Sequence, residues 1–363
     1  MTVRVSKPAF NLREKLSELD KPSGIKGNEL MRSETTQEAR DFIRAGRRNL
    51  FHNGACEIKQ RGTSFSSAGW TADRWYMYAT GGTTTIETSN PPSGFTHYLQ
   101  AASATSSCIF SQAIELKNQG SAGQFKQGRT LTVSWYAKTT NSGGEYMKLN
   151  SSFRQSSTSG TNSVSLTGDD INVELKISET WARYSRTFRI NVEPHSSSKI
   201  IVMQIRTPSG ALGTVSLTGF QCEFGSEPTE FEHRSFGEEL ALCQRFFAVY
   251  HPTSQERIYI EGSNATHRWW EHPIPAGMRT EPSITKGGTC STLSIGIAGS
   301  LTINSLSVTG VDNGGASGTT HPGSMGNVSY RVGTTGTGGD SYSMRHTDGW
   351  QAGAGWINMD AEI

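Results

Sequence analysis

The sequence predicts a mainly β protein, with a short N-terminal helical segment, a jelly-roll-like β-sandwich and then a second C-terminal β-domain. Three observations favour this fold class. Apolar and polar residues alternate along the middle of the chain, as they do in half-buried strands. Clusters of Gly, Ser, Thr and Asn separate these stretches as turns do. Aromatic residues make up 9% and the net charge is only +2, which is typical of a folded chain.

Residues 1–47 are predicted to form two short helices. Their apolar stripes consist of Leu12, Leu16 and Leu19 in the first helix and of Phe42 and Ile43 in the second. Each helix has about ten residues, which is too short to be stable alone in water. The stripes are therefore expected to dock on the body of this chain, on identical chains around a symmetry axis, or on a different partner.

Residues 48–235 are predicted to form the β-sandwich. Its clearest strand places Leu131, Val133, Trp135 and Ala137 on one face. We expect further strands over Ser198–Arg206 and from Val215 through Leu217 and Phe220, with Phe231 on the closing strand, and hairpin loops at 141–145 and 156–163.

Residues 236–363 are predicted to begin with a short helix over Glu238–Tyr250 and to continue as the second β-domain. Its expected strands are Arg257–Glu261, Ala265–Glu271, Ser283–Lys286, Leu293–Ile297, Ser305–Val308, Asn327–Val332 and Trp356–Ile363. The two ends of the chain differ in charge. Residues 1–50 contain eleven Lys or Arg and seven acids, whereas residues 291–363 contain only two Arg and five acids.

Composition excludes several classes of protein. No stretch approaches about 18 consecutive apolar residues, so we expect no membrane insertion. Residues 1–11 lack the apolar core of a secretory signal, and the low net charge gives no nucleic-acid footprint. The cysteines are odd in number and form no CxxC pair, which favours buried free thiols over a zinc site or a disulfide framework. They are Cys56, Cys108, Cys222, Cys243 and Cys290.

No catalytic or metal-binding constellation is present in the sequence, and we expect no enzyme activity and no cofactor. The histidines are scattered, and the motifs of serine hydrolases, zinc proteases and phosphate-binding loops are missing. Glycoside cleavage needs two facing carboxylates. Asp169 and Asp170 are adjacent instead, which favours a turn over a catalytic pair or a calcium site.

Aromatic residues are the better candidates for a function, because sugar rings stack on Trp and Tyr. Alternation places Tyr76 and Tyr78 on one face of a strand and Trp75 on the other. Together with Trp270 and Trp350, these two tyrosines are the candidate glycan-binding aromatics. The competing interpretation for Trp75 is core packing, and for the other tryptophans it is packing at a subunit interface.

Three groups of segments resemble tail-fibre and other appendage proteins of tailed bacteriophages. Asn11–Asp20 with Gly27–Arg40 is similar to their virion-attachment region. A second group is similar to the first and last strands of a carbohydrate-binding-module-like jelly roll, and a third to C-terminal fibre domains. The second group is Arg48–Gly54, Gln60–Phe65, Thr71–Trp75, Leu217–Gly225 and Phe231–Ser235, and the third is Pro275–Pro282 with Asp360–Ile363.

This resemblance implies a protein of the phage particle, made in the host cytoplasm. It implies a homotrimer that is attached through residues 1–47 to another virion protein of the tail or head, with an outward C-terminus that contacts host surface glycan. The leading hypothesis is a fibre-like tail appendage. The alternative is a capsid decoration or head-fibre protein with a purely structural role. A polysaccharide-degrading tailspike is a third hypothesis, which the missing catalytic pair disfavours.

Overall fold

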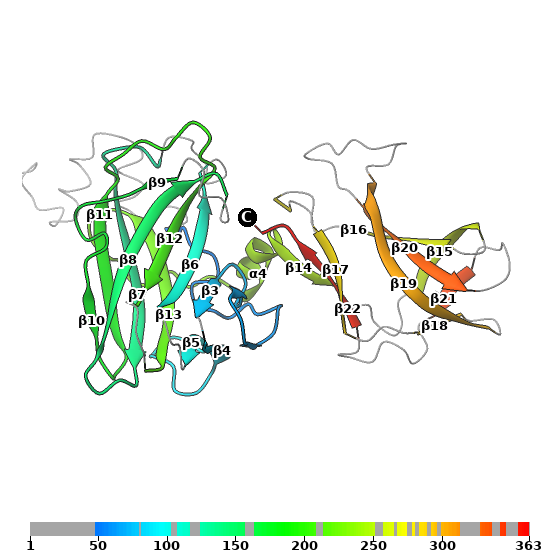
Figure 1. The fold of residues 1–363 in the computed structure, drawn as a ribbon, viewed down its shortest axis with the longest axis horizontal. Coiled ribbons are helices and arrows are strands. Elements are labelled where there is room, and N and C mark those ends of the chain that lie inside the picture. The colour runs from blue at the N-terminus through cyan, green and yellow to red at the C-terminus, as the bar shows by residue number, and fades with distance from the viewer. Residues whose placement is uncertain are drawn as a thin grey trace, which may run out of the picture.

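The structure is a computed structural model of the chain (Figure 1). It describes residues 48–79, 81–102, 107–116, 124–156, 163–207, 213–250, 257–264, 267–273, 278–279, 283–288, 292–295, 299–312, 327–335, 342–345 and 355–362. The predicted helices of residues 1–47, with the docking residues Leu12, Leu16, Leu19, Phe42 and Ile43, lie outside the described residues.

Two antiparallel sheets pack face to face between residues 64 and 224 and confirm the predicted β-sandwich (Figure 1). The first sheet has the order β1(Ser64–Phe65)-β4(Thr83–Glu87)-β5(Tyr98–Ala102)-β13(Val215–Phe224)-β7(Thr130–Thr139)-β11(Ala182–Arg189). The second has the order β10(Leu175–Ile177)-β8(Glu145–Arg154)-β12(Ile200–Arg206)-β6(Cys108–Glu115)-β3(Tyr76–Ala79)-β2(Gly69–Trp70), and β9(Val164–Ser165) pairs with β8. Strands adjacent in a sheet are often distant in sequence, as expected for a jelly roll.

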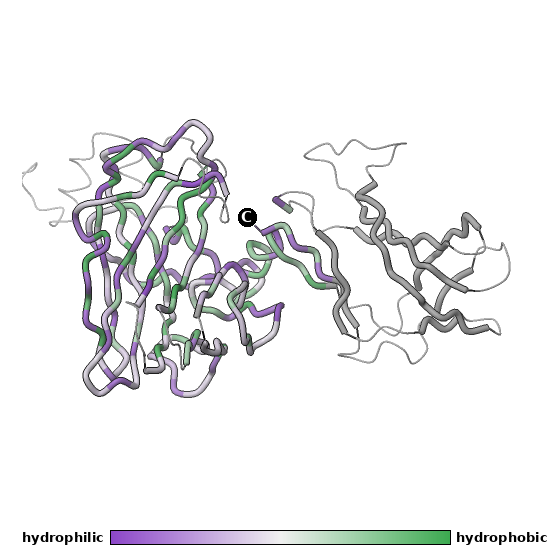
Figure 2. Tube along the Cα trace, in the orientation of Figure 1, coloured by the Kyte–Doolittle hydropathy of each residue, from purple (hydrophilic) through white to green (hydrophobic). Residues whose placement is uncertain are grey.

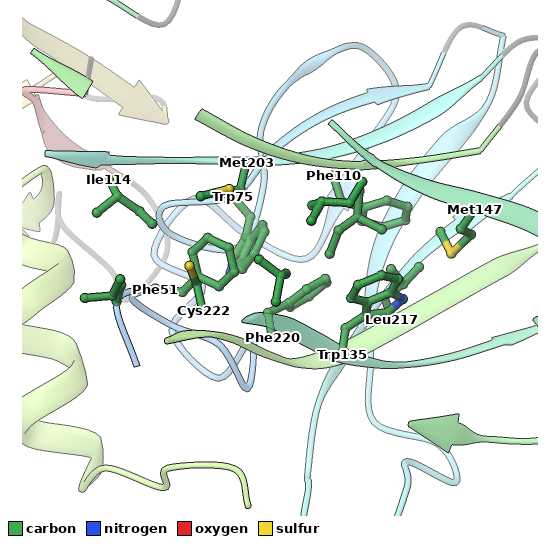
Figure 3. Close-up of a cluster of buried hydrophobic side chains, with 14 of the residues drawn as sticks. Phe51, Trp75, Phe110, Ile114, Trp135, Met147, Met203, Leu217, Phe220 and Cys222 are labelled. Atoms are coloured by element: carbon green, nitrogen blue, oxygen red, sulfur yellow. The ribbon is translucent and has the colours of Figure 1, made fainter. Parts of the chain in front are cut away.

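Large apolar side chains from both sheets fill the space between them (Figure 3). The predicted alternation in β7 is confirmed, because Leu131, Val133, Trp135 and Ala137 are all fully buried. Figure 2 shows the corresponding change between hydrophobic and hydrophilic residues along the strands of the sandwich. The indole of Trp75 lies 4.0 Å from the ring of Phe220, measured between centroids. The segment just before β3 thus contributes to the same core as β13, the last strand of the sandwich.

Phe231 does not lie on a strand, so that prediction was wrong. Both edges of β13 are already paired, with β5 on one side and β7 on the other, and no edge is left for a closing strand. Residues 225–235 are held instead by side chains of β13. The backbone N–H of Glu232 donates to Gln221 Oε1 at 2.8 Å, and the ring of Phe231 packs on Phe95 with centroids 4.9 Å apart.

The helix that follows the sandwich is shorter than predicted. It is α4, Phe236–Gln244, and Ser235 caps it by accepting a hydrogen bond from the N–H of Glu238. The end of the predicted helix is the strand β14(Phe247–Tyr250), which joins a three-stranded sheet of order β14-β22(Gly355–Asp360)-β17(Ser283–Gly288). A pairing with a strand about a hundred residues away overrides the helical pattern of this segment.

The C-terminal part is also built of antiparallel strands. Its six-stranded sheet has the order β18(Thr292–Ile295)-β19(Gly299–Asp312)-β20(Asn327–Thr335)-β16(His267–Pro273)-β15(Arg257–Asn264)-β21(Tyr342–Arg345). Every strand predicted here has a counterpart, and β21 was missed. Among the described residues, no helix is long and apolar enough to cross a membrane.

Buried arginines join the sandwich to α4, β14 and the C-terminal residues, which lie between the sandwich and the six-stranded sheet (Figure 1). We call this contact the junction, formed by Arg61, Arg74, Phe246, Phe247 and Glu362. The guanidinium of Arg74 lies 3.5 Å from the ring of Phe246, and that of Arg61 lies 3.4 Å from the ring of Phe247. Both arginines form ion pairs with Glu362, whose carboxylate is 3% exposed.

Four of the cysteines are free and buried, as predicted. They are Cys56, Cys108, Cys222 and Cys243, and Cys290 lies outside the described residues. Burial raises the pKa of each of the four thiols above its usual value, in the case of Cys108 to about 11. These thiols are therefore protonated at neutral pH, which makes them poor nucleophiles and poor metal ligands.

The stability of the sandwich is predicted to depend on Asp73 next to the junction. Burial raises the pKa of this carboxyl group to about 6, although hydrogen bonds from Gln60 and the charge of Arg61 oppose the rise. The folded state then binds more protons than the unfolded state between about pH 4 and pH 6, so ionisation of Asp73 lowers the free energy of unfolding as pH rises through this range. The loss should amount to about 3 kcal/mol.

The test is chemical denaturation of the wild type and of Asp73→Asn at several pH values from 4 to 7. We expect the stability of the wild type, relative to that of the variant, to fall as pH rises. Glu227→Gln changes an exposed carboxylate and should give no such trend relative to the wild type. A constant difference between the wild type and Asp73→Asn would contradict the assignment.

Candidate functional site

The register of five strands aligns outward side chains in rows across the second sheet. In the first row, Tyr78 of β3, Ile109 of β6, Arg206 of β12 and Lys148 of β8 are successive cross-strand neighbours. In the second row, the neighbours are Trp70 of β2, Tyr76 of β3, Ser111 of β6, Gln204 of β12 and Asn150 of β8. We call these two rows, together with Tyr146 next to Lys148 on β8, the open face.

Tyrosines flank the open face on both sides. Tyr76 and Tyr78 are 37% and 42% exposed, whereas Trp75 is 1% exposed, so the predicted separation of these side chains onto opposite faces is confirmed. Trp70 meets Tyr76 edge to face, with ring centroids 5.4 Å apart, and so limits the orientations available to Tyr76. Tyr146 of β8 lies on the same face, at the other edge of the open face, and is 44% exposed.

The open face is polar over β12 and β8 and borders a groove at its β8 edge. The groove has a volume of about 460 Å³ and runs between β8 and residues 165–172. Its polar lining residues are Asn150, Ser151, Ser152, Arg154, Ser165, Thr167, Asn172 and Gln204. The carbonyl oxygen Oδ1 of Asn150 is buried and accepts no hydrogen bond from the described residues. An acceptor in this state can take a hydrogen bond from a hydroxyl or amide donor, whether of a water molecule or of a ligand.

The other end of this sheet is closed. Ala113, Ile200 and Val202 also point outward, yet they form a small buried apolar cluster. Arg74 of the junction donates from Nη2 to the carbonyl oxygen of Ala113 at 2.7 Å. Glu115 is paired with Arg245 at 2.9 Å and with Arg279 at 3.0 Å. The junction therefore adjoins one end of the sheet and leaves the tyrosine-flanked end accessible.

The remaining predicted site residues do not join the open face. Trp270 lies in β16 opposite Tyr330, and only its backbone is described, while Trp350 lies outside the described residues. Asp169 and Asp170 form a turn, as predicted, and accept hydrogen bonds from the backbone N–H groups of β11. Sequence reasoning missed Tyr146 and all the polar members of the open face.

The open face offers binding groups and no catalytic pair. None of the residues in its two rows carries a carboxylate, whereas glycoside cleavage requires two. Within the described part of the chain, no group of three His, Cys, Asp or Glu side chains could hold a metal ion. The chemistry available is therefore aromatic stacking, hydrogen bonding by amides and hydroxyls, and attraction of anions by Arg206 and Lys148.

Comparison with known proteins finds similarity in structure and none in sequence. No protein-family model and no curated protein sequence matches the chain. One similar structure is the CBM22-1 xylan-binding domain of Xyn10C from Paenibacillus barcinonensis, at 13% identity and a TM-score of 0.32, covering 51% of this chain and all of that one. Another is TmCBM61 in complex with β-1,4-galactotriose, at 16% identity and a TM-score of 0.31, covering 49% of this chain and all of that one.

A phage protein is also among the similar structures. It is the enzymatically active domain of tailspike protein 4 from bacteriophage CBA120, at 12% identity and a TM-score of 0.31. The match covers 49% of this chain and 21% of the tailspike domain. Similarity at this level does not indicate what the present chain binds, which has to be inferred from its own side chains.

Proposed function

We propose that the chain binds carbohydrate on the open face. The observation that carries the proposal is the flanking of an amide and hydroxyl row by exposed tyrosines, fixed in place by the strand register. Phenol rings pack against the apolar faces of sugar rings. The side chains of Ser111, Gln204 and Asn150 supply donors and acceptors for sugar hydroxyls.

The size of the open face favours an oligosaccharide over a single sugar. Three strand spacings separate β3 from β8, which corresponds to about 14 Å. Tyr76 and Tyr78 lie at one end of this span, and Tyr146 and Asn150 at the other. A single sugar could not contact both ends, whereas a chain lying across the strands could.

The biological setting proposed for this binding is the surface of a phage particle. The sequence segments that resemble phage appendage proteins support it, as does the contrast between a charged N-terminal segment and a nearly uncharged C-terminal part. In this proposal the chain is a trimeric, fibre-like tail appendage that is held through residues 1–47 and contacts host surface glycan without cleaving it. A capsid decoration or head-fibre protein is the second candidate, because the same segments would serve attachment to a head.

Removal of either exposed tyrosine should weaken glycan binding without unfolding the protein. The wild-type chain is first screened on a glycan array to find glycans that it binds. We expect Tyr76→Ala and Tyr78→Ala each to weaken binding of these glycans at least about tenfold, since a stacked ring at the centre of a contact contributes about 1.4 kcal/mol or more. Isothermal titration calorimetry measures the loss, and the bound glycan should be recovered uncleaved.

The matched control is Phe236→Ala, which removes an exposed aromatic ring from α4, outside the open face. It should bind glycan like the wild type. Equal binding by the wild type and by both tyrosine variants would exclude the open face as the site. If the wild-type chain bound none of the glycans on the array, the role of a capsid decoration protein would be favoured.

Attachment through residues 1–47 is tested by deletion. We expect the deleted chain to remain folded, because the core residues from Leu50 to Cys222 pack on one another between the two sheets, and to be missing from phage particles. Circular dichroism checks the fold and immunoblotting of purified particles checks incorporation. A deleted chain that still joins particles would contradict the attachment role.

The oligomeric state is tested separately. Light scattering of the full chain should give the mass of a trimer, and a stable monomer would contradict this expectation.

A further inference from the structure

The geometry of the open face points to an anionic polysaccharide as its ligand, held by Arg206 and Lys148 through a carboxylate or phosphate group. This inference rests on the proposed glycan-binding function and specifies its substrate class. The ligand would lie across β12 and β8, with its sugar rings against the tyrosines and its charged group over the first row of the face.

The register brings two cations together without an anion between them. Arg206 of β12 and Lys148 of β8 are direct cross-strand partners and point to the same side of the sheet. Like charges in directly opposed positions destabilise a sheet. Neither side chain forms an ion pair with the described residues, so the repulsion is not offset within this part of the fold. A bound anion would remove it.

The guanidinium of Arg206 also has unused hydrogen-bonding capacity. Its Nε is buried and donates to none of the described residues. Arginine is a rigid planar fork that matches a carboxylate or a phosphate through two parallel hydrogen bonds. Its neighbours across the sheet are Ile109 on β6 and Lys148 on β8, and neither side chain can accept a hydrogen bond from it.

The surroundings of the pair remain positive when nearby acids are included. Lys176 is the cross-strand partner of Tyr146, beside Lys148. Glu115, at the closed end of the sheet, is already paired with Arg245 and Arg279. Glu174 directly precedes Leu175, the cross-strand partner of Met147, and so lies near Lys148; it forms no ion pair with a described cation, and as one acid it leaves Arg206, Lys148 and Lys176 in excess. A neutral glycan would leave the cations without partners, and an anionic one would engage them.

A single-stranded nucleic acid also presents anions and stacking rings, but the open face fits it less well. Nucleic-acid grooves track the backbone with a continuous basic stripe. Here the cations are few, and beyond its two aromatic residues the second row holds the neutral polar residues Ser111, Gln204 and Asn150. The hydroxyl groups of sugars can form more hydrogen bonds with these neutral side chains than bases and phosphates can.

The experiment measures binding of the full chain to an array of neutral, uronate-bearing and phosphate-bearing polysaccharides. Each anionic binder is also tested after carboxyl reduction or hydrolysis of its phosphate esters, which separates the two sources of charge. A single-stranded oligonucleotide is included. We expect the tightest ligands to be anionic, their neutralised forms to bind at least about tenfold more weakly, and binding to weaken as salt increases.

The variants Arg206→Gln and Lys148→Gln assign the effect to the pair. Each should weaken binding of the anionic form about threefold to tenfold and leave binding of its neutralised form unchanged. Lys126→Gln removes an exposed cation outside the open face and should bind like the wild type. Circular dichroism and thermal unfolding confirm that each variant is folded.

The outcomes separate this inference from the function on which it rests. If neutral and anionic forms bind equally and the variants behave like the wild type, the anionic preference is wrong while glycan binding stands. Binding of the oligonucleotide in preference to every glycan would overturn both. If the wild-type chain bound none of the polysaccharides and not the oligonucleotide, both the proposed glycan binding and the anionic preference would be wrong.

Discussion

The antiparallel register of β3, β6, β12 and β8 is the constraint on which both the core and the candidate site depend. Side chains alternate across a sheet, so a shift of one residue would exchange the two faces. In the observed register, Met203 and Phe110 enter the core, while Gln204 and Ser111 point outward. The burial of large apolar side chains between the sheets fixes this register, and the rows of the open face follow from it. The placement of these residues is therefore mainly a consequence of core packing, to which the edge-to-face contact of Trp70 with Tyr76 adds within the site.

The second constraint is the junction, where the sandwich meets α4, β14 and the C-terminal residues. Arg74 is 1% exposed, and its positive φ of 73° is rare for a residue other than glycine. The ring of Phe246, the carbonyl oxygen of Ala113 and the carboxylate of Glu362 surround its guanidinium. Removing one partner of a buried ion pair costs far more than the pair contributes. Loss of a single contact in the junction would therefore be costly, and the intact set of contacts holds the closed end of the second sheet.

The sequence predicts those parts of the fold and site that depend on local alternation. The buried face of β7 and the exposure of Tyr76 and Tyr78 follow from period-two patterns alone. The polar half of the site does not, because Gln204 and Asn150 become neighbours only through the pairing of β12 with β8. One local signal was overlooked, since Tyr146, Lys148 and Asn150 alternate with buried Met147 and Leu149. The predicted helix over residues 238–250 was too long for a related reason, because only the distant strand β22 makes β14 a strand.

The open face does little for the stability of the fold, and this argues that it serves binding. Its three tyrosines keep about 40% of their surface exposed, although burial would stabilise the protein. Arg206 and Lys148 repel each other across β12 and β8, and Asn150 keeps a buried oxygen without a described donor. On the same sheet, the residues next to the junction are covered, and Glu115 is paired. Local departures from good packing and pairing are expected where a surface is shaped for a ligand. The exposed tyrosines and the two opposed cations lie on the part of the sheet that the junction leaves accessible, which agrees with the proposed binding on the open face, while the junction end joins the two parts of the chain.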